Sequence, residues 1–596
     1  MGEIALRITK LPESQGKMQF QKLERLYSTL QKGLCVEGGW VKAYGSLLLP
    51  LPLQLPQFES LAQWNDKSEP IELSAWNTDL VLSGNSTHPR LFVSNHPTYQ
   101  CAIESVLQIW EEDNAWAWVS KPLRDYFKPP TPVALVDPYS SGRFLVQRCR
   151  ALEMSVICVR STLQIEECDV QSYEQQLDDF HCTHTLEASG STNSSLEELA
   201  EELRSWGLVA VIPGSELGVE LAEKLAKMLN LTGNDPCSSI RRKDKHAMQE
   251  VLRQEGIPSA SSCRGSYEVL QTWAGNAGNA GNAGSGKCFF PVILKPPVSF
   301  ATQGVSFCES IEEVKQAFDA TYGTVNAHGV QIHEMVGQEF LHGVEFMVDT
   351  VSRHGQHLFV AAWEHSKSGS KILSKTSTIL PWSDLVEKLF NYACKVLDAL
   401  GVRYGAANLE IIDVPDRGPI LVEINARMIG HIGPSVIEKS LGISLLDLVL
   451  DSFTCGKCEL LSGSFDQVSS CHPAQRPASF GFLPARLVRL TSPRDGQLRS
   501  SIDCEHIREL PSFHSIYTSK TKGSKLKKTR DKMSTAGMVL LMDEDMAKIE
   551  QATRRIQELE GTTLYDWEDA IAIQDWDPHG QNACTSSFLR DSRAAR

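Results

Sequence analysis

GAANLEIIDVPDRGPILVEINARM (405–428) is the stretch of the chain that decides the fold. Its middle, DVPDRGP, combines two aspartates, two prolines and a glycine between alternating apolar arms, which predicts a β-hairpin. If the chain bends between Asp416 and Arg417, counting outward in equal steps places Glu410 directly opposite Glu423. Two carboxylates that face each other across an antiparallel pair repel. The hairpin therefore needs a partner that holds these two acids together.

A divalent cation would supply that partner. Because side chains alternate along a strand, Glu423, Asn425 and Arg427 share one face, and Glu410 and Asn408 lie across from them on the same face. Mg²⁺ is typically held by one or two carboxylates, with phosphate oxygens and water completing its shell. Arg427 instead suits a phosphate or a developing oxyanion. Both arms are otherwise largely apolar, which argues against a solvated hairpin with incidental acids. We therefore predict a magnesium site here.

The composition describes a multidomain protein with a large core. The chain has 596 residues, of which 42% are hydrophobic and 22% are charged, and its formal charge is −15. This acidity argues against a general nucleic-acid binder, and the most apolar early run, GSLLLPLPLQLP (45–56), is too short and too rich in proline to cross a membrane. The 16 cysteines are scattered and no signal peptide opens the chain, so we expect reduced thiols in a cytoplasmic protein.

Upstream of the hairpin, residues 133–231 have the pattern of a small parallel sheet. VALV (133–136), SVICV (155–159) and VAVIPG (209–214) are short strands of the buried type, and helical patterns follow the first and the last of them. Strands that alternate with helices in this way are typical of a doubly wound sheet.

Two lysines are candidates for binding a phosphate group. Lys295 ends the strand pattern of FFPVILKPP (289–297), and a small, glycine-containing loop follows it. The loop N–H groups and the ammonium could face the same anion, although a lysine that snorkels from a strand end is the commoner case. Lys245 lies in a helix expected from Arg241 to a stop at Gly256, where a solvated basic turn explains it equally well.

The order of these pieces resembles the ATP-grasp superfamily. The segments that carry the resemblance are VIPGSELGVELAEKLAKMLNL, RRKDKHAM, VILKPP, GVEFMVDTV, YACKVLDALGVRYGAANLE and GPILVEINARMIG. Within the superfamily, the chain looks like the amino-acid (carboxylate–amine) ligases, a branch that includes bacterial L-amino-acid ligases and carnosine-synthase-like enzymes. The similarity covers residues 130–455, and it extends more weakly to 480–560 through STAGMVLL.

The resemblance implies an α/β and α+β chain with an ATP-grasp fold. In this fold a Rossmann-like pre-ATP-grasp domain precedes two α+β lobes that clasp ATP, and here an extra N-terminal region and a small C-terminal α+β subdomain are added. The expected bounds are 1–127 for an N-terminal extension of unknown role, 128–240 for the Rossmann-like domain, 241–455 for the catalytic domain, 456–479 for a linker, 480–570 for the C-terminal subdomain and 571–596 for a tail.

The resemblance also implies which residues bind the nucleotide. The matching positions are Lys245 and Lys295 for the phosphates, Ser299 and Gly304 for the flexible lid over them, Glu334, Met335 and Val336 for the adenine hinge, and Glu345 for the ribose. The spacing from the hinge to the ribose acid is longer than in D-alanine ligases, so Glu339 competes for the ribose.

The catalytic centre implied by the resemblance is the predicted magnesium site. Glu410, Glu423 and Asn425 match the metal ligands, and Arg427 and Lys295 match the catalytic positions. The expected cofactors are ATP and Mg²⁺, with two ions bound and Mn²⁺ accepted in their place.

The implied activity is an ATP-dependent ligation of a small-molecule carboxylate to a small-molecule amine through an acyl phosphate. Neither a nucleic acid nor a membrane is an expected partner, and a homodimer is allowed. Asn408 and His431 depart from many relatives, which carry histidine and glycine there, so the substrates stay open. A loop rich in lysine and serine, 364–377, is a candidate lid that excludes water.

Two alternatives to an amino-acid ligase remain. One is an ATP-grasp carboxylase or nucleotide-pathway ligase, although the chain has no AMKM-like biotin-attachment motif. The other is a non-catalytic relative, which loss of the acids or lysines would indicate; all of them are present.

Overall fold

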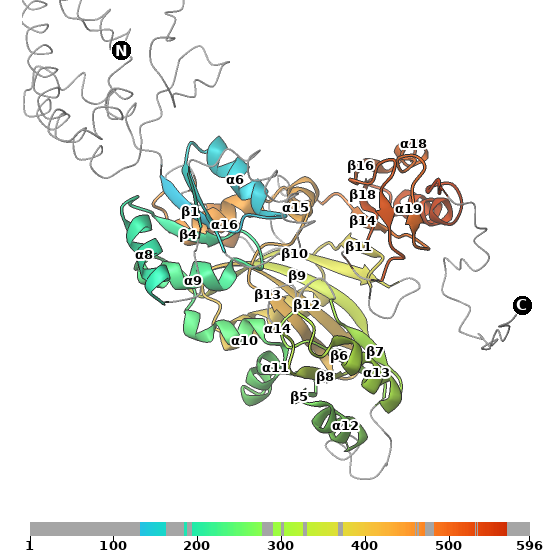
Figure 1. Ribbon diagram of the computed structural model, residues 1–596. Helices are drawn as coiled ribbons and strands as arrows, with labels where there is room; N and C mark the ends of the chain where they lie inside the picture. The colour runs from blue at the N-terminus through green and yellow to red at the C-terminus, as the bar shows by residue number, and fades with distance from the viewer. Residues whose placement is uncertain are drawn as a thin grey trace, which may run out of the picture. The chain divides into compact units, whose positions relative to one another are not determined.

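The computed structural model describes the part of the chain that carries these motifs (Figure 1). The described residues are 131–161, 184–187, 193–276, 290–299, 303–325, 331–367, 373–458, 461, 464–470, 482–530, 532 and 534–568. The predicted N-terminal extension, the tail and most of the predicted linker lie outside them, and the domain bounds stay a prediction. None of the helices in the described ranges is long and apolar enough to span a membrane.

The hairpin is present, and its two acids face each other as predicted. Strand β12 (Gly405–Val414) pairs antiparallel with β13 (Gly418–Asn425). The pairs nearest the predicted metal site are Asn408 with Asn425, Leu409 with Ile424 and Glu410 with Glu423. The predicted register is therefore confirmed in the half of the hairpin that carries the acids.

Nearer the turn, the predicted register was wrong by one residue. Val414 pairs with Gly418, so the bend is centred on Asp416 and not between Asp416 and Arg417. Asp416 and Gly418 have φ values of 64° and 79°, a left-handed conformation that glycine adopts without strain. Val422 is then an extra residue of β13, and this β-bulge shifts the register back before the acids.

The hairpin forms one edge of an eight-stranded antiparallel sheet (Figure 1). The strand order is β13-β12-β9-β10-β11-β14-β18-β16. The further strands are β9 (Val344–Arg353), β10 (Gln356–Ser366), β11 (Thr376–Ile379), β14 (Ala485–Leu490), β18 (Gly537–Met542) and β16 (Phe513–Tyr517). Because β11 pairs with β14, the C-terminal α+β part continues the same sheet.

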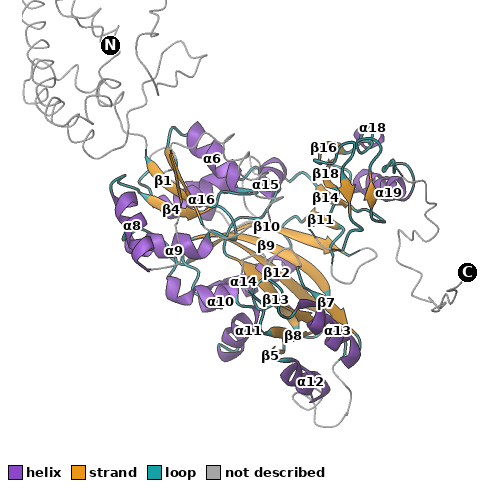
Figure 2. Cartoon of the chain, viewed as in Figure 1, coloured by secondary structure: helices purple, strands orange, loops and turns teal. Residues whose placement is uncertain are grey.

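Helices cover one face of this sheet (Figure 2). Its apolar side chains on that face are buried in one cluster with those of the helices. Helix α14 (Asp384–Ala399) begins at its N-cap Ser383, whose side chain accepts a hydrogen bond from the N–H of Val386. Its apolar stripe packs with α11 (Lys245–Gln254) against residues such as Leu409 of the hairpin. The acids lie on the opposite face, since they alternate with these core positions.

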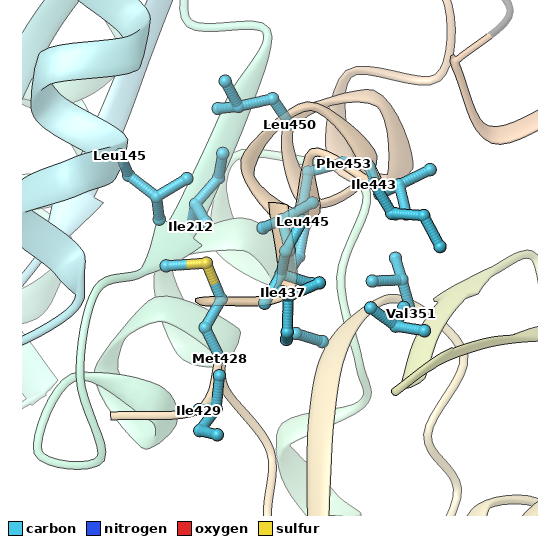
Figure 3. Close-up of a cluster of buried hydrophobic side chains, with 14 of the residues drawn as sticks. Leu145, Ile212, Val351, Met428, Ile429, Ile437, Ile443, Leu445, Leu450 and Phe453 are labelled. Carbon is cyan, nitrogen blue, oxygen red and sulfur yellow. The ribbon is translucent and has the colours of Figure 1, made fainter. Parts of the chain in front are cut away.

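The face that carries the acids packs, at its centre, against α15 (Gly433–Leu441) and α16 (Leu445–Thr454). Figure 3 shows this apolar cluster, in which Val351 of the sheet lies with Ile437 and Leu445 of the two helices. The cluster also includes core residues of the parallel sheet, so the parallel sheet packs with the eight-stranded sheet in one core.

The predicted parallel sheet is present and has four strands in the order β3-β2-β1-β4. They are β1 (Pro132–Val136), β2 (Ser155–Arg160), β3 (His184–Glu187) and β4 (Ala210–Pro213). The helices of this region are α6 (Gly142–Ala151), α8 (Asn193–Arg204) and α9 (Val219–Met228). Strand β1 is almost completely buried, as expected for a parallel strand covered on both faces.

A smaller antiparallel sheet carries the lysine predicted to grip a phosphate. Its strands, in spatial order, are β5 (Ser262–Gly265), β8 (Met335–Glu339), β6 (Val292–Lys295) and β7 (Ser306–Cys308). Helices α12 (Tyr267–Asn276) and α13 (Ile311–Thr321) pack on it and bury Leu270 and Phe318. Lys295 is the last residue of β6 and pairs with Val336 of β8.

The helix expected from Arg241 to Gly256 is two helices, which corrects the prediction. Helix α10 (Ser239–Lys243) ends at Asp244, which has an extended backbone, and α11 starts at the next residue. The Asp244 side chain accepts hydrogen bonds from the N–H groups of His246 and Ala247. Aspartate is a strong N-cap because it satisfies helical N–H groups that otherwise lack partners. Lys245 is therefore the first residue of a helix.

The C-terminal part packs its own core behind β14, β16 and β18. Helix α19 (Met546–Gly561) lies on these strands, and the short pieces are α18 (Glu505–Arg508), β15 (Gly496–Gln497) and β17 (Lys525–Leu526). The remaining short helices of the described residues are α17 (Ser464–Ser469) and the 3₁₀ turn η2 (Pro236–Ser238).

One cysteine contradicts the expectation of reduced thiols. Cys158 of β2 is disulfide-bonded, whereas the other described cysteines are free. A disulfide requires two Cα atoms within roughly 7 Å of each other, a condition that scattered spacing in sequence does not reveal.

Candidate active site

The two facing acids of the hairpin are each held by a lysine. The Glu423 carboxylate lies 3.2 Å from Lys245 Nζ, and Lys532 Nζ donates a hydrogen bond of 3.0 Å to Glu410 Oε1. Both acids are mostly buried, with side-chain exposures of 20% for Glu423 and 13% for Glu410. Burial raises the pKa of Glu423, but Lys245, Lys532 and Lys295 outweigh it and lower the pKa overall. The ammonium groups of these lysines therefore offset the repulsion between the two carboxylates that the sequence predicts.

Lys245 and Lys295 are near enough to interact electrostatically with each other and with Glu423. Lys245 is buried, and its ammonium also donates a hydrogen bond of 2.7 Å to the carbonyl oxygen of Ser299. Burial and repulsion from Lys245 lower the pKa of Lys295 to about 8, although Glu423 and Glu410 act in the opposite direction. Within the described residues Lys295 forms no ion pair with an acid. A phosphate group would supply the missing negative charge.

The predicted lid begins directly after this lysine pair. Ser299 is buried, and Gly304 has a φ of 67°. A Cβ atom on Gly304 would meet Pro296 Cγ at 3.0 Å, so this position needs glycine for two reasons. Residues 300–302 between them lie outside the described residues, and the lid role of Ser299 and Gly304 stays a prediction.

Arg427 is fixed by three contacts. Its Nη2 donates to Asn425 Oδ1 at 3.2 Å, its Nη1 donates to the carbonyl oxygen of Met428 at 2.7 Å, and its Nε lies 3.2 Å from Glu216 Oε2. Glu216 belongs to the turn after β4 of the parallel sheet. Burial raises the pKa of Glu216, and Arg427 opposes that shift. The parallel sheet therefore supplies the acid that positions Arg427.

Sequence reasoning missed Glu216, although a signal for it exists. It lies just beyond the carboxyl end of a parallel strand, which is where ligands bind in doubly wound sheets.

The predicted adenine hinge lies in β8 and at its start. Met335 and Val336 are fully buried, so only their backbone groups are available to a base. Glu334 is exposed, and Arg264 Nε donates to its carboxylate at 2.8 Å. Val336 is the register partner of Lys295, so the hinge and one phosphate-binding candidate are neighbours in one sheet.

Glu339 and Glu345, the two acids proposed to bind the ribose, both form ion pairs within the protein. Arg417 binds Glu339 through two hydrogen bonds of 2.9 Å. Glu345 lies 2.5 Å from Lys367 Nζ and 3.2 Å from His365 Nδ1. Burial raises the pKa of Glu345, but His365 and Lys367 lower it to about 2. The assignment of either acid to the ribose stays a prediction.

A buried acid lies beneath the substrate end of the hairpin. Asp349 Oδ1 accepts a hydrogen bond of 2.7 Å from Asn408 Nδ2, and its Oδ2 accepts one of 2.8 Å from Trp363 Nε1. Burial raises the pKa of Asp349 to about 6, although both hydrogen bonds favour its charged form. These contacts hold the amide of Asn408 in a fixed orientation.

The C-terminal part contributes two cations that sequence reasoning missed. Lys532 contacts Glu410, as described above, and Arg489 of β14 interacts electrostatically with Glu410 and Glu345. Lys532 ends the basic run KTKGSKLKKTRDK (520–532), whose sequence is typical of a solvated loop. No local pattern distinguishes Arg489 from a surface residue of a strand. Only the pairing of β11 with β14 brings them to the site.

The donor set fits magnesium and nucleotide phosphates. Among the described residues, no three side chains of His, Cys, Asp or Glu are grouped as a metal site. The set is instead two carboxylates, Glu410 and Glu423, with the amide of Asn425 beside them, and this suits a hard cation that keeps phosphate and water ligands. The ammonium of Lys295, which has no acidic ion-pair partner in the described part of the chain, fits the phosphates themselves.

Comparisons with known proteins agree with this geometry. A family model for the ATP-grasp domain matches residues 288–435. Dapdiamide A synthase of Enterobacter agglomerans is 27% identical over 438 residues, which cover 72% of this chain and 95% of that protein. Alanine–anticapsin ligase of Bacillus subtilis (strain 168) is 24% identical over 332 residues, which cover 51% of this chain and 68% of that protein.

A solved structure shares the fold. The L-amino acid ligase from Bacillus licheniformis superposes with a TM-score of 0.55 at 14% identity, covering 72% of this chain and 97% of that one. The matched region contains the facing glutamates, Lys295 and Arg427, and the expected fold class, α/β and α+β with an ATP-grasp architecture, is confirmed. Residues 288–435 are therefore similar to the ATP-grasp domain, and the chain is similar to ligases such as dapdiamide A synthase and alanine–anticapsin ligase.

Proposed function

We propose that this protein is an ATP-dependent ligase that joins a carboxylate to an amine and releases ADP and phosphate. The observation that carries the proposal is the facing pair of Glu410 and Glu423, with Lys245 beside Glu423 and Arg427 beside Asn425. This face offers a cation site between two acids and positive groups for phosphate oxygens. It contains the chemistry of phosphoryl transfer and no side chain that must act as a nucleophile.

In the first step, an oxygen of the acid substrate attacks the γ-phosphorus of ATP, and the bond to the bridging oxygen breaks, so ADP leaves. Lys245 and Lys295 hold the phosphates, and Arg427 orients the transferred group against the acid. Bound Mg²⁺, held by Glu410, Glu423 and Asn425, would neutralise phosphate oxygens. We propose two such ions, in keeping with the two acids.

In the second step, the amine nitrogen attacks the carbonyl carbon of the acyl phosphate. The carbon–oxygen bond to the phosphate breaks, inorganic phosphate leaves, and the proton of the amine passes to solvent or to the departing phosphate. Asn408, which donates a hydrogen bond to Asp349, lies across from Asn425 at the same end of the hairpin. We propose that its amide lies near the reacting groups in this step. The protein contributes positioning and charge rather than covalent chemistry.

The names of the relatives suggest the class of substrate. One relative is named as a ligase of alanine and anticapsin, and we propose that at least one substrate of this chain is likewise an amino acid. The homodimer, the cytoplasmic location and the lid at 364–377, whose residues 368–372 lie outside the described residues, stay predictions.

The proposal is tested by phosphate release from Mg·ATP across a panel of amino acids, offered singly and in pairs. We expect release above background only with particular pairs, together with a product whose mass is the sum of the two amino acids minus water. Phosphate release without any such product, or no release with any pair, would contradict the ligase function. Glu423→Gln serves as the control that should abolish both signals.

A further inference from the structure

A buried ion pair joins the C-terminal helix α19 to the start of β11. The carboxylate of Glu560, near the end of α19, accepts hydrogen bonds of 2.5 Å from Lys375 Nζ on both of its oxygens. The side chains are 6% exposed for Lys375 and 0% exposed for Glu560. Taking two charges out of water costs free energy that their attraction often fails to offset, so a buried pair is weak evidence for a purely stabilising role. This pair therefore needs another explanation.

The same carboxylate also binds the end of β14. Glu560 accepts a hydrogen bond of 2.7 Å from the N–H of Thr491, the residue after β14, and one of 3.2 Å from Thr491 Oγ1. Lys375 Nζ donates to this hydroxyl at 2.8 Å, so its ammonium has three hydrogen-bond partners. Tyr565 Oη donates to the carbonyl oxygen of Thr491 at 2.9 Å. One acid of α19 thus ties the end of β14 to the start of β11.

This network lies where the C-terminal part joins the eight-stranded sheet. The pairing of β11 with β14 is short: its register pairs are Thr376 with Val488, Ser377 with Leu487, and Thr378 with Arg486. A hydrogen bond of 2.9 Å from the N–H of Arg489 to the carbonyl oxygen of Lys375 follows these pairs. Glu560 therefore holds the end of a short joint from both strands.

Arg489 depends on the segment that Glu560 holds. Its backbone N–H binds Lys375, as described above, and its Nη1 donates to the carbonyl oxygen of Ser374 at 3.1 Å and to Ser377 Oγ at 3.2 Å. Arg489 forms no ion pair with any residue that the structure describes, and its charge interacts with that of Glu410. A shift of Lys375 would therefore move this charge relative to Glu410.

We propose that Glu560 is a positioning residue of the candidate active site: it holds Lys375 and thereby fixes Arg489 where its charge acts on Glu410. The inference rests on the proposed ligase function and adds a residue of the C-terminal helix to it. A fixed positive charge beside Glu410 would help to neutralise the phosphate oxygens gathered there during phosphoryl transfer. The competing explanation is that the ion pair only stabilises the C-terminal part.

The first test measures kcat for phosphate release with the amino-acid pair that the screen identifies. Glu560→Gln removes the charge but keeps an oxygen for the N–H of Thr491. We expect kcat to fall about tenfold, as in Arg489→Gln. Because Glu560 acts through Arg489, adding Glu560→Gln to Arg489→Gln should lower kcat less than about twofold further. Two losses that multiply would instead indicate independent roles.

The second test does not depend on ligation, because the pKa of His431 reports where Arg489 lies. Burial lowers this pKa to about 4, together with the positive charges that surround the ring, which are Arg489, Arg427, Lys532 and Arg143. Displacement of Arg489 in Glu560→Gln should raise the pKa of His431 toward that of an ordinary histidine. NMR titration of the full chain with isotope-labelled histidine measures it, and His431→Gln identifies the signal.

Lys375→Met/Glu560→Gln separates positioning from stability. Replacing both members of a buried pair is often neutral for folding, so the free energy of unfolding should return close to the wild-type value. The kcat should stay low and the pKa of His431 should stay raised, because methionine cannot hydrogen-bond to Thr491. If Glu560→Gln alone does not fold, this double variant decides the result.

Glu223→Gln is the matched control. Glu223 forms a buried ion pair with Arg242, with side-chain exposures of 5% and 2%, between α9 and α10. This variant should lower the free energy of unfolding, because it leaves Arg242 without its partner. It should change neither kcat nor the pKa of His431.

Two outcomes would overturn the inference. One is a folded Glu560→Gln with the wild-type kcat and the wild-type pKa of His431. The other is recovery of kcat together with stability in Lys375→Met/Glu560→Gln, which would leave the ion pair a stabilising role alone. Absence of any ligation product in the wild-type protein would refute the ligase function, whereas the titration of His431 would still show whether Glu560 positions Arg489.

Discussion

Lys532 and Glu410 are 122 residues apart in the sequence, yet Lys532 Nζ lies 3.0 Å from Glu410 Oε1. The contact is possible because β14 pairs with β11 in the eight-stranded sheet and brings the C-terminal part to the face that carries the acids. A positive group thus stands against one of the two carboxylates predicted to bind magnesium. The C-terminal part belongs to the candidate active site and is not a separate appendage.

The pKa of Lys295 predicts how nucleotide affinity depends on pH. Burial and the nearby Lys245 lower this pKa from 10.5 to about 8, so the ammonium loses its proton as the pH rises through that value. The affinity of the free protein for ADP without Mg²⁺ should then fall about tenfold between pH 7.5 and 9.5. Isothermal titration calorimetry across this range measures the change.

Lys295→Arg is the control for this pH effect. Arginine keeps its charge throughout the range, so its ADP affinity should vary less than about twofold. An equally steep fall in this variant would mean that another group titrates.

Asp244 predicts a link between helix capping and ATP binding. Asp244→Ala removes the hydrogen bonds to His246 and Ala247, which should cost about 1–2 kcal/mol in the free energy of unfolding. It should also raise the KM for ATP severalfold, because Lys245 is the first residue of the helix that Asp244 caps. Urea unfolding and steady-state kinetics measure the two effects.

Asp545→Ala is the matched control. Asp545 caps α19 by accepting a hydrogen bond from the N–H of Ala547, outside the acid-bearing hairpin. It should cost a similar free energy of unfolding with no change in the KM for ATP. The same rise in KM in both variants would refute a specific role for Asp244.

Glu216 is predicted to position Arg427. Glu216→Gln keeps the size of the side chain but removes the charge that lies 3.2 Å from Arg427 Nε. We expect kcat to fall about tenfold, with the KM for ATP within twofold, because Arg427 is proposed to act on the transferred group and not on the bound nucleotide. Glu220→Gln, which breaks only the ion pairs with Lys224 and Lys243, should leave kcat unchanged.

A change in the KM for ATP alone in Glu216→Gln would contradict this role. So would an unchanged kcat, since Arg427 would then need no charged partner. The free energy of unfolding should be measured in parallel, so that a general loss of stability is recognised.

Much of the site was predictable because its signals are local. Alternation along two strands and a proline-rich turn were enough to place Glu410 opposite Glu423. The turn itself was misplaced by one residue, since neither the left-handed conformation at Asp416 nor the bulge at Val422 follows from composition. The acids nevertheless face each other, because the bulge compensates for the shift.

The helix break at Asp244 could have been predicted but was not. An aspartate followed by a helical pattern is a capping signal, and the preceding basic run hid it. Lys532 and Arg489 are different, because no local pattern links them to the hairpin. Their role depends on β11 pairing with β14, a contact between segments more than 100 residues apart. Long-range pairing of this kind is decided by packing of the whole sheet.

We propose that a cation binds between Glu410 and Glu423 and holds nucleotide phosphates. The most direct test is the affinity for ADP with and without Mg²⁺ in the wild-type protein, in Glu410→Gln and in Glu423→Gln. We expect Mg²⁺ to tighten ADP binding at least about tenfold in the wild-type protein and to have almost no effect in either variant, while the affinity without Mg²⁺ is kept or increased. The same gain from Mg²⁺ in all three proteins would contradict it.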